Sequence, residues 1–274
     1  MREIKALIWK EWRRCRWVIV LILATAGMMH LFFYYHPNEE YPRVYSFLHK
    51  LLFEAVGLIL GAAPFSSEYE SQGIEFLQTQ PLSKGKIWAA KVFSSLGMLL
   101  ILSVGSILVF QWVSIRRTDG SLSSLPAGLA NMMQSMKWIN ISRGILDPVE
   151  FFAAACLCSN VFASSFLASF LAGALWALFL AIAQGYSTSA LSYILGNSGF
   201  DGIADWAFAH FACLIIFGLA FSVCILVSSF AAFRRSEQGL AQRAWAGLGS
   251  CLIMILGTQC LFWLSCYLGN FPRR

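Results

Sequence analysis

Two ionisable residues four positions apart, Lys50 and Glu54, stand in an otherwise apolar stretch of the sequence. Side chains four positions apart lie on the same side of a helix, so these two can form a local ion pair. An ionisable group inside a membrane span is costly and is usually paired or functional. We therefore predict an ion pair near the outer end of this helix. The alternative that stays open is that Glu54 lies on the path of a transported substrate.

A second chemical pattern is Gly196-Asn197-Ser198-Gly199, which has the Gly-x-Ser-Gly form of intramembrane serine proteases, with His210 in the next apolar run. Such an enzyme must hold its serine beside a base below the membrane surface. Here Ser198 stands in a polar turn, with Asp201 and Asp205 nearby. We therefore interpret the four residues as part of a loop.

The remaining reactive residue types predict neither a catalytic site nor a metal site. The four histidines have no metal-site spacing. Most of the eight cysteines fall in apolar runs, where a free cysteine behaves as a small apolar packing residue. Cys156 and Cys158 point to different helix faces and make a poor ligand pair. The sequence has no Gly-x-x-x-x-Gly-Lys-Ser/Thr phosphate loop, so we expect no nucleotide or other cofactor on this chain.

The composition places these residues in a membrane protein. Hydrophobic residues make up 58% of the 274 residues and charged residues only 12%, whereas an ordinary soluble domain carries roughly 25% charged residues. The net charge of +6 is explained by basic residues beside anionic lipid headgroups, so membrane lipid is the expected partner and nucleic acid is not. Lipid cannot satisfy exposed backbone groups, so helices are the expected elements.

Apolar runs of about 20 residues, the length that crosses the hydrocarbon as a helix, occur at seven places. They are 17–35, 47–66, 92–113, 149–169, 170–186, 207–232 and 246–268. No Pro-rich or Gly/Ser-rich linker divides the chain. We predict one domain over residues 1–274: an all-α, polytopic membrane bundle of six to seven transmembrane helices.

The Lys and Arg residues predict the orientation, because cytoplasmic loops carry the excess. With a cytoplasmic amino terminus, twelve basic residues lie inside and seven outside. The segment 1–16 alternates apolar and basic residues at helical spacing, which predicts an interfacial amphipathic helix or, equally, a plain topology signal. We place outer loops at 114–148 and 187–206 and a tight hairpin of two helices that turns near Ser164.

A polar segment, 67–84, separates the second and third apolar runs. Ser67 with Glu70 fits a capping box, so a short helix should begin there. It should run to about Gln78 and stop before Pro81, which cannot continue a helix. Ser83 should then cap the next helix, which enters the membrane through residues 87 and 88.

One face of the predicted short helix is apolar. This face holds Tyr69, Gly73, Phe76 and Leu77, whereas Glu68, Glu75 and Gln78 lie elsewhere. An apolar face bordered by acidic residues is typical of a helix that docks into a groove on another protein. A solvated helix that only joins two spans is the alternative.

The order of residues from 61 to 91 resembles the permease subunits of type-two ATP-binding-cassette (ABC) exporters. The resemblance rests on Glu68-x-Glu70, Gly73, Phe76-Leu77, Pro81-Leu82-Ser83-Lys84, Ile87 and Lys91. In that family this loop holds a cytoplasmic coupling helix that docks on the ATPase subunit. The resemblance thus implies a docking surface made by Glu68, Tyr69, Glu70, Gly73, Phe76, Leu77 and Pro81.

The same resemblance implies the partners and the energy source. A separate cytoplasmic ABC ATPase subunit would bind ATP and magnesium, and two permease copies, identical or different, would surround one path through the cell membrane. This chain differs from the family at Ile74, where threonine is common, and in its apolar run 246–268, which offers a seventh span beyond the usual six. An ion-gradient-driven transporter and a membrane scaffold without transport are the alternatives.

Overall fold

The computed structural model describes residues 2–35, 41–70, 82–119, 137–162, 164, 166–179, 203–237, 239–250 and 253. Within these residues every regular element is a helix, as the composition predicts. The long helices are α1 (Arg2–Tyr35), α2 (Tyr41–Glu70), α4 (Lys84–Asp119), α6 (Lys137–Val161) and α8 (Ile203–Arg234). A shorter apolar helix covers Phe166–Phe179, and α9 (Leu240–Ala244) continues into the π-helix η2 (Trp245–Gly249).

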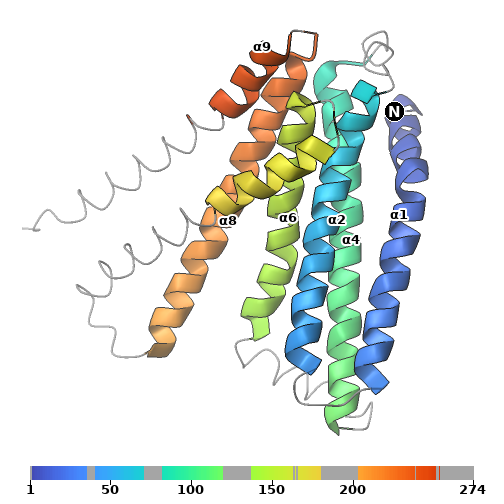
Figure 1. Ribbon diagram of the computed structural model, residues 1–274, viewed down its shortest axis with the longest axis vertical. Helices are drawn as coiled ribbons and strands as arrows, with labels where there is room; N and C mark the ends of the chain where they lie inside the picture. The colour runs from blue at the N-terminus through green and yellow to red at the C-terminus, as the bar shows by residue number, and fades with distance from the viewer. Residues whose placement is uncertain are drawn as a thin grey trace, which may run out of the picture.

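The long helices stand side by side, and the start of α1 lies at the same end of the bundle as α9 (Figure 1). Four helical segments among the described residues are long and apolar enough to cross a membrane: Ile4–Phe32, Phe47–Ser66, Lys84–Val109 and Gly144–Val161. Helix α4 has 36 residues, which is about 54 Å at the rise of an α-helix. It therefore exceeds the hydrocarbon thickness of about 30 Å and extends beyond it.

Helices α2 and α6 pack most closely, because glycines on α2 face the backbone of α6. A Cβ atom at Gly57 would overlap the carbonyl oxygen of Pro148, and one at Gly61 would overlap that of Phe152. Lipid tails are as apolar as leucine side chains, so helices in a membrane associate through such close van der Waals contact. The two glycines fix the position of α6 on α2.

The helix over Phe166–Phe179, drawn in yellow in Figure 1, runs obliquely across α6. Ala168 and Ala172 pack against Ala154, Ala155 and Cys158 of α6. Helix α6 ends at Val161, only a few residues before the turn predicted near Ser164. The predicted division of the 149–186 stretch into two helices is therefore confirmed as far as residue 179.

Three predicted boundaries differ from the structure. Residues 2–16 form one helix with the first span instead of a separate surface helix, because neither Gly nor Pro interrupts them and Cys15 packs into the core. No helix begins at Ser67: α2 continues to Glu70, which keeps Glu68 on the same buried face as Leu60 and Phe65. The predicted loops 114–148 and 187–206 are partly helical, since α4 reaches Asp119, α6 begins at Lys137 and α8 begins at Ile203.

The start of α4 agrees with the sequence. Its first residue is Lys84, and the carbonyl oxygen of Ser83 accepts hydrogen bonds from the backbone N–H groups of Lys86 at 2.9 Å and Ile87 at 3.1 Å. Residues 71–81, which include the middle of the predicted coupling helix, lie outside the described residues. So do the apolar run 254–268 and the Gly-x-Ser-Gly turn at 196–199.

Candidate functional site at the basic end of the bundle

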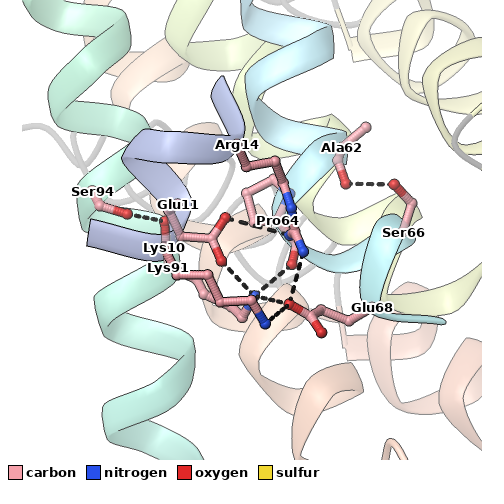
Figure 2. Close-up of polar contacts among 9 residues, drawn as sticks. All are labelled: Lys10, Glu11, Arg14, Ala62, Pro64, Ser66, Glu68, Lys91 and Ser94. Atoms are coloured by element: carbon pink, nitrogen blue, oxygen red, sulfur yellow. Dashed lines mark hydrogen bonds and ion pairs between the residues drawn. The ribbon is translucent and has the colours of Figure 1, made fainter. Parts of the chain in front are cut away.

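Five charged side chains gather where α1, α2 and α4 meet (Figure 2). We call this group the charge cluster; it consists of Lys10, Glu11, Arg14, Glu68 and Lys91. Helix α1 supplies the first three, the last turn of α2 supplies Glu68, and α4 supplies Lys91. The cluster therefore joins three helices at one end of the bundle.

Lys91 is the centre of the cluster and is fully buried. Its Nζ atom lies 2.7 Å from Oε1 of Glu11, 3.1 Å from Oε1 of Glu68 and 2.9 Å from the carbonyl oxygen of Pro64. An ammonium group has three N–H donors, so these three acceptors use all of them. A buried cation is tolerated only when it is paired in this way, which explains why two carboxylates converge on Lys91.

Glu68 is the point at which the cations converge. Its Oε1 atom accepts hydrogen bonds from Lys10 at 3.1 Å and from Arg14 at 3.2 Å, in addition to that from Lys91. Burial alone raises the pKa of the carboxyl group, but the charge of Lys91 and the hydrogen bonds from Lys10 and Lys91 outweigh it and lower the pKa to about 2. Glu68 is therefore ionised at neutral pH.

The placement of Glu68 differs from the exposed acidic docking residue that the sequence predicts. Only 2% of the residue is exposed, and its carboxylate points into the bundle. The physical reason is the buried charge of Lys91, which needs a second carboxylate. The last turn of α2 contains Tyr69 and Glu70, whose side chains are not among those described. The other four predicted docking residues lie outside the described residues: Gly73, Phe76, Leu77 and Pro81.

The borders of the segment 71–81 are both fixed to the bundle. On one side Glu68 is held by the charge cluster, and on the other Lys84 contacts Glu237 at 2.6 Å, next to the end of α8. One turn later, Trp88 donates to the hydroxyl oxygen of Ser229 on α8 at 3.3 Å. A displacement of this segment would therefore act on α1 through one border and on α8 through the other.

The ion pair predicted between Lys50 and Glu54 is confirmed, and a third member joins it. Nζ of Lys50 lies 3.5 Å from Glu54 and 2.8 Å from Asp147 on α6. Asp147 is remote in the sequence, so helical spacing on α2 gave no sign of it. The side chain of Glu54 is 12% exposed.

Three further polar contacts, none of them predicted, join the apolar helices. The hydroxyl oxygen of Ser106 lies 2.8 Å from Nε2 of His49 and 3.3 Å from Nε2 of His30. The indole N–H of Trp176 donates to Glu150 at 2.9 Å, across the hairpin. All of these pairs come from different helices, so a pattern within one helix does not reveal them.

The described residues contain no group of three or more His, Cys, Asp or Glu side chains able to hold a metal ion. Cys15, Cys156, Cys158 and Cys224 are free thiols there, and the first three are buried, as expected for packing residues. Cys156 and Cys158 belong to different apolar clusters, which confirms that they point to different faces.

The chain matches no protein-family model, no curated protein and no solved structure.

Proposed function

We propose that this chain is the membrane-spanning permease subunit of a type-two ABC exporter. A separate cytoplasmic ATPase subunit, which carries ATP and magnesium, drives the export of a substrate across the cell membrane. The amino terminus is cytoplasmic, and two permease copies surround the path. The complete chain then holds six or seven spans, including the four helices long enough to cross.

The observation that carries this proposal is the position of the charge cluster beside the segment that resembles a coupling helix. Glu68 stands three residues before the segment 71–81, and Lys91 stands ten residues after it. Their carboxylate and ammonium groups meet at 3.1 Å, and Glu11 of α1 meets the same ammonium at 2.7 Å. A push on this segment therefore reaches α1 through buried charged contacts.

The mechanism needs two conformations with different contacts at this end of the bundle. Closure of the ATPase moves segment 71–81, and α1 and α4 follow as a unit because buried pairs connect them. Helix α4 meets α8 through the exposed pair of Lys84 with Glu237 and the neutral hydrogen bond of Trp88 with Ser229, so these two helices separate at a smaller cost than the buried pairs around Lys91. The path then opens between the tightly joined helices and α8.

The test compares Phe76→Asp with Gln78→Asp, in the same segment and with the same added charge. Phe76 lies on the apolar face of the predicted coupling helix, and Gln78 does not. In membranes that contain the ATPase subunit, Phe76→Asp should let ATP hydrolysis continue while transport stops, and Gln78→Asp should retain both. Full coupling in Phe76→Asp, or transport by protein purified without a nucleotide-binding subunit, would contradict the proposal.

The second candidate is an ion-gradient-driven transporter. The observation that favours it is the group formed by Lys50, Glu54 and Asp147, since ionisable residues inside spans often mark ion paths. Transport that requires an ion gradient, ignores ATP and is lost in Glu54→Gln with normal expression would support this candidate. Unchanged transport by Glu54→Gln would remove it.

A further inference from the structure

A groove of about 500 Å³ runs between α1 and α4. Its floor is made by buried apolar side chains from three helices, including Ile19, Phe53 and Leu102. Its edges are exposed apolar side chains such as Leu23 and Ile101. The groove is therefore an open apolar channel on the side of the bundle.

The groove follows α1 from Trp12 to His30. These residues are 18 positions apart, which is about 27 Å along a helix. The hydrocarbon core of a bilayer is about 30 Å thick, so the groove runs through nearly its whole depth. At the far end, the hydrogen bond between His30 and Ser106, at 3.3 Å, joins α1 to α4.

The other end of the groove has a positively charged entrance. Trp12, Arg16, Ile19 and Leu23 follow one another at intervals of three or four residues, so they share one face of α1. Arg16 is exposed, and its guanidinium carbon lies 5.4 Å from the ring centre of Trp17. The entrance therefore combines an exposed cation with tryptophans, which favour the headgroup level of a membrane.

We infer that this groove binds one acyl chain of an anionic phospholipid, with the lipid phosphate beside Arg16. The apolar floor fits the chain, and the cation at the entrance fits the phosphate. The charge cluster, on the same stretch of α1, contains three cations and two carboxylates and adds to the positive potential. A transmembrane helix of a second copy would match the apolar edges but has no use for the cation, so charge complementarity favours the lipid.

Two glycines show where the groove has room. A Cβ atom added at Gly27 or at Gly105 would meet no atom within 4 Å, although both residues line the groove. A larger side chain at Gly105 therefore starts in open space and extends into the groove. Gly173 on the helix over Phe166–Phe179 has the same open space, lies outside the groove and provides a matched control.

The experiment places the full chain in nanodiscs of equal amounts of phosphatidylglycerol and phosphatidylcholine with identical acyl chains. Native mass spectrometry then counts the lipids that stay bound when the chain is released from the nanodisc. We expect the wild-type chain to retain phosphatidylglycerol preferentially. Gly105→Leu should lower the retained fraction about tenfold, the loss that follows when about two buried methylene groups are displaced, and Gly173→Leu should leave it unchanged.

Arg16→Gln tests the entrance, with Arg235→Gln as a control, since Arg235 follows directly on α8 and is exposed. Arg16→Gln should reduce the preference for phosphatidylglycerol over phosphatidylcholine about fivefold, the effect of one basic residue near a charged membrane surface. Arg235→Gln should not. Equal retention by wild type and Gly105→Leu would overturn the proposal. So would a Gly105→Leu chain that loses its dimer mass and keeps its lipid, because the occupant would then be a second copy.

Discussion

At the scale of single residues, Lys91 is the charge on which the basic end of the bundle depends. In the sequence it is one of several lysines at the start of an apolar run and the last residue of the motif that resembles the exporter permeases, and neither pattern names its partners. Its counter-charge Glu11 stands 80 positions earlier, inside a basic stretch that predicts surface exposure. By contrast, Lys50 and Glu54 were recognisable because their spacing places them on one helix face. Contacts within a helix could be predicted, and contacts between distant helices could not.

Replacing Lys91 by methionine should destabilise the protein strongly. The change leaves the buried carboxylate of Glu11 without its closest cation, and breaking a buried pair in this way costs about 3–5 kcal/mol. The melting temperature of the detergent-solubilised chain measures the loss. Lys86→Met is the matched control, because Lys86 lies in the same helix and is exposed. A melting temperature lowered by the same small amount in both variants would contradict a central role for Lys91.

Glu68 gives the basic end a defined pH dependence. Its pKa is about 2 in the folded chain, below the ordinary value of 4.5. A carboxyl group with a lowered folded pKa contributes stability that is fully present above its unfolded pKa and is lost as the pH falls through the folded value. The contribution should therefore be constant above about pH 4.5 and disappear toward pH 2.

The measurement compares the melting temperatures of wild type and Glu68→Gln between pH 7 and pH 3. The variant cannot ionise at this position, so the difference between the two proteins should shrink as the pH falls below 4.5. A difference that stays constant over the whole range would show that ionisation of Glu68 does not carry the effect.

At the scale of elements, the apolar runs correctly predicted the middle parts of the long helices. The polar residues near the helix ends predicted wrong boundaries. Ser67 and Glu70 have the types and spacing of a capping box. The helix nevertheless continues through them, because ending it at residue 66 would remove Glu68 from Lys91. Residues 2–16 likewise have the pattern of a surface helix or, equally, of a plain topology signal, and the sequence does not reveal that Glu11 is buried. Tertiary charge pairing overrides the local signal in both cases.

The approach of α2 to α6 can be tested at Gly61. An alanine Cβ at this position would overlap the carbonyl oxygen of Phe152, so the two helices must separate. Overpacking of this kind costs about 1–3 kcal/mol. Gly61→Ala should therefore lower the melting temperature, whereas Gly97→Ala, where the added atom meets nothing within 4 Å, should not. A drop of the same size in Gly97→Ala would point to a general intolerance of the bundle.

At the scale of the whole molecule, the described helices bring the basic residues predicted to face the cytoplasm to one end. The start of α1, the start of α4 and the end of α8 meet there, around the charge cluster and the contact between Lys84 and Glu237. The composition alone predicted a helical membrane protein. The order in which the helices pack was not predictable, because it depends on close contacts such as those at Gly57 and Gly61.

The predicted orientation can be measured with a membrane-impermeant maleimide. Gly239 lies at the basic end and Tyr35 at the opposite end of α1, and both are exposed. Gly239→Cys should react only after the cells are permeabilised, and Tyr35→Cys should react in intact cells, because the positively charged side stays inside. The unmodified chain controls for reaction of its own cysteines. The reverse pattern would place the amino terminus outside.

The 80 positions between Glu11 and Lys91 also matter while the protein is being made. A ribosome adds about 5–20 residues per second, so Glu11 emerges roughly 4–16 seconds before its main counter-charge. During that interval the first helix carries a carboxylate, at its headgroup end, that has not yet met this counter-charge. The packing of this end of α1 against α2 and α4 is therefore completed late in biogenesis, when α4 enters the membrane.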